Sequence, residues 1–566
     1  MGWGSLPRKE VIMKHFKKMM ALVIALVMIV GTMVPAFAAE TIVPEGLEAD
    51  TTVTINGLDK GDTVNLYQLV KWSNNADNTS AGWVLTDTFK DDDACKAVLA
   101  RINAKTDGVY TLTQDDVKAF TDVLNNGTKP TAVTGGSVSD AGVYTNSPID
   151  TGMYIALVKP ATAGTLYNPI IVSADYFNNG TNEIDASSAS LSTAVAKKET
   201  LDVQKEEEDD DDNTEYSYDV GDNVGFTVTT TIPTYAEIYE NPSFKVTDEL
   251  STGLVLDASK GIKVYKEDGT TEIATLTSAV TANGTSGWTL NVPSSYIKAL
   301  EAPQKIVIKY EATLTESNFT SVNEETNDVK VEFSNNPNDD TEKGTVKDKT
   351  RTYTFSIDGK LLGNTSVDTS ELVKVAVDGN GDPILQSSST NETYTNALAG
   401  AKFGLYTDSS ATIPYTNTSG KDFTNIMTDS DGYMEINGLD AGTYYLKEIT
   451  APAGFIKDQT IHEIVISATY KTESHTEDGY TYDLQVLDTY TITIDGNSSS
   501  TYTMTLDGSD IKTSSISASN ALLNNTKGVE LPSTGGMGTT LFYIIGAVLV
   551  LGAGILLVTR RRMSAN

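Results

Sequence analysis

Three polar residues in the middle of the chain stand at the ends of apolar rows. Residues two apart on a strand share a face. The rows are Leu201, Val203 and Lys205; Phe244, Val246 and Asp248; Val329, Val331, Phe333 and Asn335. A buried lysine loses its charge readily and becomes a nucleophile, while a buried acid keeps a proton that can polarise an amide carbonyl. Asn336 and Glu249, on the opposite faces, are the alternatives.

A fourth row predicts a similar acid further along the chain. Tyr444, Leu446 and Glu448 share a face, which indicates that Glu448 is buried. Groups of this kind react with one another only when neighbouring strands hold them together. Well-oriented intramolecular partners can then gain ~7 to 11 kcal/mol of the barrier.

The elements that must position these residues are short strands rich in Thr, Val, Tyr and Ile, separated by Gly, Asn, Asp and Ser turns. The clearest predicted strands are Val224 to Pro233, Lys305 to Leu314, Asp328 to Ser334, Thr443 to Glu448 and Tyr490 to Leu506. Helices are expected only at Asp91 to Asn103 and Gln114 to Leu124. The pattern predicts an all-β chain of tandem immunoglobulin-like sandwiches.

Changes in composition suggest where the domains begin and end. The polar stretches Asn178 to Ser192 and Asn335 to Lys349 are expected to separate domains, and the acidic run Lys205 to Asp212 to be a solvated loop. The predicted parts are a signal peptide (1–38), three β-rich domains (39–195, 196–345 and 346–528) and a C-terminal segment (529–566).

Both ends of the chain carry export features. Lys14, Lys17 and Lys18 precede the apolar stretch Met19 to Val34, and small residues around Ala38 suit a signal-peptidase cut after it. We also consider Met13 as an alternative start.

At the other end, an apolar run from Leu541 to Val558 approaches the ~20 residues that span a bilayer. Arg560, Arg561 and Arg562 follow the run and favour a cytoplasmic end.

Composition excludes several classes of function. A formal charge of −35 and a pI near 4.4 argue against nucleic-acid binding. The single cysteine, Cys95, excludes an intramolecular disulfide and is expected to be a small buried hydrophobe.

Enzyme motifs are absent from the sequence. His462 and His475 are the only histidines of the expected mature chain, and Asp378 to Pro383 is a turn without the glycine of a calcium loop. We expect no cofactor, no metal and no turnover of an external substrate.

The segment Leu531-Pro532-Ser533-Thr534-Gly535-Gly536, followed by the apolar run and the arginines, resembles the cell-wall sorting signal of Gram-positive surface proteins. The resemblance implies that a sortase cuts between Thr534 and Gly535 and transfers the Thr534 carbonyl to an amine.

Two internal segments carry a second resemblance. Tyr444 to Phe455, preceded by Leu398 to Tyr406, resembles the E-box and first-strand signature of Cna-B-like domains, and Asp219 to Leu254 resembles a Cna-A-like domain. The whole resembles a sortase-assembled backbone pilin. The resemblance implies Lys–Asn isopeptide bonds in place of disulfides.

In the second domain the resemblance assigns the bond to Lys205 and Asn335, with Asp248 as the promoting acid. In the third it assigns Lys374 and Asn525, with Glu448 as the acid. Lys360 and Asn524 are alternatives in the third domain.

The resemblance also implies an exposed lysine that accepts Thr534 of the next subunit. The segment Thr193 to Glu199 occupies the corresponding place but lacks the family's Tyr-Pro pair and Asn. We align Lys197 with the motif lysine and keep Lys198 as the alternative. The implied partners are pilus-type and housekeeping sortases, identical subunits joined head to tail, accessory pilins, peptidoglycan and host surface ligands.

Two other functions are consistent with parts of the sequence. A monomeric wall-anchored adhesin built on the same domains is the main alternative. A surface hydrolase is a weaker one, because the chain has so few histidines and cysteines.

Overall fold

The structure is a computed structural model of the whole chain. It describes residues 41–42, 51–73, 82–105, 110–126, 130–174, 184–185, 192–208, 216–236, 239, 241–316, 322–335, 343–357, 372–382, 386–387, 392–393, 398–430, 432–507, 510–518, 521–528 and 537–563. The predicted signal peptide (1–38), the cut after Ala38 and the motif from Leu531 to Gly536 lie outside these residues, as do Asn336 and Lys360.

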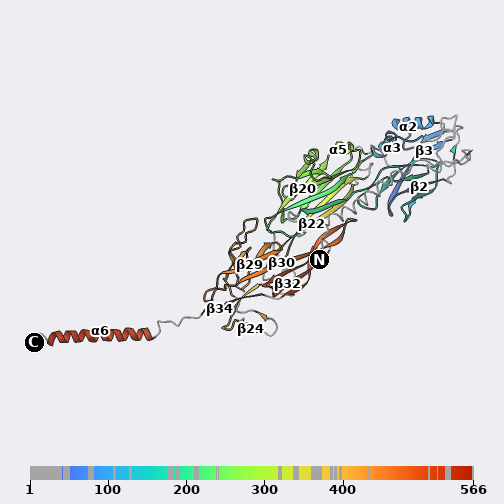
Figure 1. Ribbon diagram of the computed structural model, residues 1–566. Coiled ribbons are helices and arrows are strands. Elements are labelled where there is room, and N and C mark those ends of the chain that lie inside the picture. The colour runs from blue at the N-terminus through green and yellow to red at the C-terminus, as the bar shows by residue number, and fades with distance from the viewer. Residues whose placement is uncertain are drawn as a thin grey trace, which may run out of the picture.

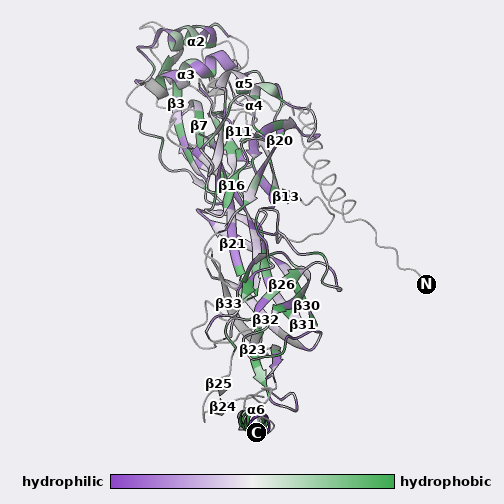
Figure 2. Ribbon diagram, turned by 90° about the vertical axis from the view of Figure 1, so that its left-hand side faces the viewer, coloured by the Kyte–Doolittle hydropathy of each residue, from purple (hydrophilic) through white to green (hydrophobic). Residues whose placement is uncertain are grey.

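The molecule is elongated, and its parts follow one another in chain order (Figure 1). Two clusters of buried hydrophobic side chains lie between residues 53 and 196. A third cluster draws its residues from 201 to 346, with Leu166 added from the first part of the chain. Another cluster lies between residues 353 and 523. Figure 2 shows the same succession, with α2 and α3 at one end and α6 at the other. We use the predicted divisions at 195/196 and 345/346 to name a first, second and third domain, and these boundaries stay a proposal.

The first domain holds the two longer helices of the ectodomain that the structure describes, α2 (Asp93–Ala104) and α3 (Gln114–Asn126). Asp92 caps α2 by accepting a hydrogen bond from the Cys95 amide at 2.8 Å, which satisfies one of the free N–H groups of the first turn. Cys95, Val98 and Ile102 then form the buried stripe of α2. Both helices were predicted, and Cys95 is a buried hydrophobe as expected.

Two four-stranded sheets carry the rest of the first domain, in the orders β11-β2-β6-β5 and β4-β3-β7-β9. Two further pairs, β1-β10 and β12-β8, complete it. The strands are β1 (Thr41–Ile42), β2 (Thr51–Asn56), β3 (Thr63–Ser73), β4 (Gly82–Leu85), β5 (Ser137–Val138), β6 (Tyr144–Ile149), β7 (Gly152–Lys159), β8 (Thr165–Tyr167), β9 (Ile170–Ala174), β10 (Ile184–Asp185), β11 (Thr193–Val195) and β12 (Lys198–Thr200).

The second domain is a sandwich of a five-stranded and a six-stranded sheet. The first has the order β13-β14-β20-β16 with β17 also on β20, and the second runs β18-β19-β15-β21-β22-β28. The elements are β13 (Val203–Glu208), β14 (Asn223–Ile232), β15 (Phe244–Leu250), β16 (Leu254–Leu256), β17 (Lys263–Lys266), α4 (Ala274–Thr277), β18 (Val280–Ala282), β19 (Gly287–Val292), α5 (Ser294–Lys298), β20 (Gln304–Leu314), β21 (Val322–Ser334) and β22 (Lys343–Ile357).

Parts of two polar stretches are strands. In the predicted separator Asn335 to Lys349, residues 343–349 belong to β22, which pairs with β21 and then with β28 (Ile436–Leu439). The lysines at 343, 347 and 349 lie on one face of β22, while Gly344 and Val346 are buried on the other. The acidic run begins inside β13, where Glu207 accepts a hydrogen bond from Thr352 at 2.7 Å.

The third domain is built on a seven-stranded sheet, β27-β26-β29-β30-β31-β32-β33, and a parallel pair of β23 with β34. The strands are β23 (Leu372–Val377), β24 (Gln386–Ser387), β25 (Glu392–Thr393), β26 (Lys402–Tyr406), β27 (Ile426–Met427), β28 (Ile436–Leu439), β29 (Gly442–Thr450), β30 (Ile461–Glu477), β31 (Tyr480–Ile494), β32 (Ser498–Asp507), β33 (Asp510–Ala518) and β34 (Ala521–Thr526). The prediction of a single strand from Tyr490 to Leu506 is wrong. The chain reverses between β31 and β32, where Asp495 and Gly496 take positive φ angles of 52° and 67°.

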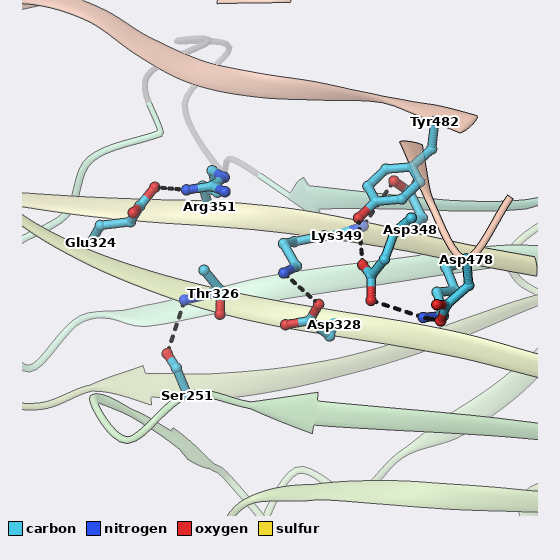
Figure 3. A network of polar contacts seen from close by, with 11 residues as sticks. Ser251, Glu324, Thr326, Asp328, Asp348, Lys349, Arg351, Asp478 and Tyr482 are labelled. Atoms are coloured by element: carbon cyan, nitrogen blue, oxygen red, sulfur yellow. Dashed lines mark hydrogen bonds and ion pairs between the residues drawn. The ribbon is translucent and has the colours of Figure 1, made fainter. Parts of the chain in front are cut away.

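The long hairpin of β30 and β31 reaches the second domain. Lys347 on β22 contacts Glu477 at 2.8 Å and Asp478 at 2.5 Å near the tip of the hairpin. Tyr480 packs against the core of the second domain. Figure 3 shows Asp348 and Lys349 of β22 beside the hairpin residue Tyr482. The hairpin therefore fixes the third domain against the second.

The helix α6 (Met537–Met563) follows the third domain. Its segment Leu541–Met563 contains an 18-residue window with a mean hydropathy of 2.7 and is long enough to cross a membrane. The arginines at its end lie in the last turn, as the sequence predicted.

Candidate functional site

The second-domain group begins with a lysine and a carboxyl that face each other across the sandwich. Lys205 extends from β13 of one sheet and Asp248 from β15 of the other, and both side chains are fully buried. Lys205 Nζ donates a hydrogen bond to Asp248 Oδ2. Alternation along the strands explains this placement, because each residue belongs to an inward row of core side chains.

Tyr310 and Asn327 complete the second-domain group. The Tyr310 hydroxyl on β20 lies 2.6 Å from Lys205 Nζ and donates to Asp248 Oδ2 at 2.8 Å. Asn327 on β21 donates from Nδ2 to the same hydroxyl at 2.8 Å. A nucleophilic nitrogen, an acid and a carboxamide thus meet in one buried cluster.

The structure does not bring Asn335 into this cluster. Asp248 pairs with Val329 of β21, whereas Asn335 follows the end of that strand, roughly 20 Å further at ~3.3 Å per residue. Asn335 is half-buried and lines a 780 Å³ cleft together with Tyr480. The asparagine that the structure places in the cluster is Asn327, which is fully buried on the same face of β21 as Asn335.

The alternative Glu249 is also excluded from the cluster. Its side chain is exposed, since it lies on the outer face of β15. Parity correctly separated Asp248 from Glu249. It could not separate Asn327 from Asn335, because both belong to one alternating row.

Burial sets the protonation of the second-domain group. It lowers the pKa of Lys205, against the opposing effect of the Asp248 carboxylate, and raises the pKa of Asp248, against the opposing effect of the Lys205 amine. Both shifts favour the neutral pair, an amine with a free lone pair and a carboxylic acid with its proton.

Two oxygens of the second-domain group remain without a partner. Among the residues that the structure describes, Asp248 Oδ1 and Asn327 Oδ1 are buried and accept no hydrogen bond. A proton carried on Asp248 Oδ1 is available to polarise an amide oxygen that lacks a donor.

The third-domain group contains the three residues named from the sequence. Lys374 on β23, Glu448 on β29 and Asn525 on β34 are fully buried. Lys374 Nζ lies 3.5 Å from Glu448 Oε1 and 5.3 Å from the centre of the Phe403 ring. The side chain of Asn524, the alternative to Asn525, is exposed.

Main-chain groups hold the amide and the acid of the third-domain group. Asn525 Nδ2 donates to Ile456 O at 2.8 Å and to Glu448 Oε2 at 3.0 Å. The Asp458 amide donates to Glu448 Oε2 at 2.6 Å. Burial lowers the pKa of Lys374, which favours the neutral amine.

The two candidate connecting lysines differ in their surroundings. Lys198 Nζ is paired with Asp59 at 2.7 Å. Lys197 is exposed and lines a 510 Å³ groove with Thr234 and Tyr235. No ion pair engages Lys197 within the described part of the chain.

The predicted turn at Asp378 is a turn. Asp378 Oδ1 accepts hydrogen bonds from the amides of Asn380 at 2.8 Å and Asp382 at 3.0 Å. The Asp378 carboxylate is therefore engaged by its own loop.

Comparisons with known proteins agree with this architecture. A family described as a prealbumin-like fold domain matches residues 385–481, and an LPXTG cell wall anchor motif matches residues 524–564. The trypsin-resistant surface T6 protein of Streptococcus pyogenes serotype M6 is 26% identical over 494 residues, which cover 80% of this chain and 86% of that one.

A solved structure shows the same fold. The T6 backbone pilin of serotype M6 Streptococcus pyogenes, described as a modular three-domain structure, has a TM-score of 0.52 at 21% identity, over 85% of this chain and 99% of that one. The major pilin SpaD from Corynebacterium diphtheriae has a TM-score of 0.46 at 18% identity, over 86% of this chain and 99% of that one. The anchor motif, the prealbumin-like domain and the T6 relative support a sortase-assembled major pilin that is exported and anchored to the cell wall of a Gram-positive bacterium.

Proposed function

We propose that this chain forms the shaft of a covalent pilus in which the Thr534 carbonyl of one subunit is joined to Lys197 of the next. A pilus-type sortase makes each joint, and a housekeeping sortase transfers the finished fibre to peptidoglycan. Accessory pilins complete the fibre, and the first domain offers the surface for host ligands.

The contrast between buried and exposed lysines supports this proposal. Lys205 and Lys374 are fully buried beside an acid and an amide, whereas Lys197 is exposed at the junction of the first two domains. Burial suits a lysine that reacts inside its own domain. An enzyme, however, must reach the lysine that joins two subunits.

We propose that the two buried groups form intramolecular isopeptide bonds, Lys205 to Asn327 and Lys374 to Asn525. In each, the neutral lysine Nζ attacks the amide carbon of the asparagine, the bond from that carbon to Nδ2 breaks, and ammonia leaves. Asp248 or Glu448 donates to the amide oxygen as negative charge develops on it. The single observation that carries the proposal is the convergence of lysine, acid and asparagine in both domains.

The polymer is tested in the native host with Lys197→Ala, Lys198→Ala and the double variant. The double variant is expected to leave monomer on the wall and to abolish the high-molecular-weight ladder on denaturing gels of wall extracts. Lys60→Ala is the matched control, because Lys60 is an exposed lysine of the same domain with a side chain 73% exposed.

The outcomes separate the alternatives. A ladder that survives in the double variant would place the connecting lysine elsewhere. Wild-type protein that never forms a ladder would favour the monomeric adhesin.

A further inference from the structure

Tyr310 occupies the centre of the second-domain group. Its hydroxyl is within hydrogen-bond distance of the attacking nitrogen Lys205 Nζ (2.6 Å), the acid oxygen Asp248 Oδ2 (2.8 Å) and the departing nitrogen Asn327 Nδ2 (2.8 Å). Among the described residues, no other side chain is hydrogen-bonded to all three, so the Tyr310 hydroxyl is the one group of this part of the chain that is placed to exchange protons with both nitrogens.

We propose that Tyr310 is a catalytic residue of second-domain crosslinking and relays a proton from the Lys205 amine to the departing nitrogen of Asn327. This inference rests on the proposed Lys205–Asn327 bond. It adds a fourth participant to the lysine, the acid and the asparagine.

The relay accounts for every proton in the reaction. As the bond from Lys205 Nζ to the Asn327 amide carbon forms, Nζ becomes cationic and gives one proton to the Tyr310 oxygen. The hydroxyl gives its own proton to Nδ2, the bond from the amide carbon to Nδ2 breaks, and ammonia leaves. Tyr310 and Asp248 end with the protons they began with, so no outside reagent is consumed.

The hydrogen-bond roles are consistent with this sequence. In the unreacted group Nδ2 donates to Tyr310, because the lone pair of a carboxamide nitrogen is delocalised. Before the attack, the Tyr310 hydroxyl donates its proton to Asp248. After the attack, Nδ2 is an amine with a free lone pair and can accept that proton instead. The change requires rotation of one hydroxyl and no movement of the chain.

Aromatic packing fixes the position of the hydroxyl. The Tyr310 ring stacks on Phe226 with centroids 5.4 Å apart and meets the edge of Trp288 at 5.3 Å. Burial, with the nearby Asp248 carboxylate, holds the pKa of Tyr310 well above its usual value. The phenol therefore stays protonated and regains its proton after the transfer.

In the part of the chain that the structure describes, the third-domain group has no equivalent hydroxyl. Asn525 Nδ2 is held by the carbonyl of Ile456, which accepts a hydrogen bond but has no proton to give. Glu448 must then donate a proton to the amide oxygen and also exchange protons with the departing nitrogen. The third domain is thus an internal control within the same molecule.

The test is Tyr310→Phe in the full chain, which removes the hydroxyl and keeps the ring. Newly made protein is sampled over time, and peptide mass spectrometry measures the loss of ammonia in each domain separately. We expect second-domain crosslinking to slow by at least ~100-fold, within the range of general acid–base catalysis. Crosslinking of the third domain should keep its wild-type rate.

Two further variants separate catalysis from folding. Tyr239→Phe removes another buried hydroxyl of the second domain, one that makes no hydrogen bond among the described residues, and should leave both rates unchanged. Asn327→Ala cannot crosslink and keeps Tyr310. Before crosslinking, Tyr310→Phe should melt within a few degrees of Asn327→Ala, which shows that the slow rate is not a failure to fold.

The two proposals fail in distinguishable ways. If wild type loses ammonia from the second domain and Tyr310→Phe does so equally fast, the relay is wrong and the bond stands. If wild type retains that ammonia, the Lys205–Asn327 bond itself is wrong. If Tyr310→Phe melts far below Asn327→Ala, the hydroxyl has a structural role and the relay is rejected.

Discussion

The two buried groups contain the same chemistry in different settings. In the second domain Lys205 and Tyr310 come from one sheet and Asp248 and Asn327 from the other, so the proposed bond crosses the core between sheets. In the third, β23 and β34 are neighbouring parallel strands, and the proposed bond joins the ends of the domain. The comparison shows that the reactive trio can be held either by a side-chain hydroxyl or by the main chain.

The difference determines what each group depends on. The second-domain group depends on core packing, because Phe226 and Trp288 hold Tyr310. The third-domain group depends on the loop after β29, whose Ile456 carbonyl and Asp458 amide hold Asn525 and Glu448. Changes in the core should therefore affect the first reaction, and changes in that loop the second.

The largest expected effect follows removal of either acid. In the Asp248→Ala variant the second domain should keep the ammonia that wild type loses, and in the Glu448→Ala variant the third domain should keep it. Each variant should therefore be heavier by one ammonia, after allowing for the substitution, and the other domain should be unaffected. By analogy with a disulfide closing a loop of ~100 residues, each lost crosslink should cost about 5 kcal/mol of the free energy of unfolding. Intact mass and thermal unfolding of the two single variants and the double variant measure this.

The comparison would break if the two domains were coupled. The double variant should retain two ammonias, and the two losses should add, since the sites share no partners. Retention of ammonia in both domains after one substitution would contradict independent reactions.

A smaller effect is expected at the contact between the two domains. Lys347→Ala removes the contacts with Glu477 and Asp478, so the tip of the hairpin should exchange its amide hydrogens several-fold faster. Both crosslinks should still form, because Lys347 touches neither group. Hydrogen exchange followed by mass spectrometry reports both quantities, and Lys402→Ala, on β26 of the third domain, is a control.

A further effect concerns pH and is confined to the second domain. Burial raises the pKa of Glu207 to about 8, while its usual value is 4.5. The folded state therefore holds a proton that the unfolded chain releases, and stability should fall as the pH rises from about 4.5 to 8, by at most about 1.4 kcal/mol per unit.

Glu207→Gln tests this directly. The variant should flatten the pH dependence of the melting temperature in that window. Part of the slope should remain, because burial also raises the pKa of Asp348 to about 7. An unchanged slope in Glu207→Gln would show that Glu207 is ionised in the folded protein.

Much of the site could be predicted from alternation along strands. Lys205, Asp248 and Glu448 each lie on the same face of a strand as a row of buried apolar residues, and this alternation predicts that they are buried. Lys374 and Asn525 required the family resemblance, because both strands carry apolar residues on each face. The fold class followed from the same alternation.

The failures have physical causes. Asn327 and Asn335 lie on one face of β21, so only the pairing of Asp248 with Val329 distinguishes them, and pairing is not visible in one strand. Tyr310 lies in the inward row of β20 with Ile306, Ile308 and Ala312, so alternation predicts its burial but not its place beside Lys205. The β31–β32 turn was missed because its polar residues interrupt an otherwise continuous alternating pattern.

The most direct test of the central claim is a tryptic map of the mature wild-type protein. Trypsin separates the candidates, since Asn327 falls in the peptide from Tyr310 to Lys330 and Asn335 in the next one, from Val331 to Lys343. We predict one branched peptide that joins the first of these to the segment containing Lys205, lighter by one ammonia than the sum of its parts. A branch to the Val331–Lys343 peptide, or recovery of all the segments as linear peptides, would contradict the account.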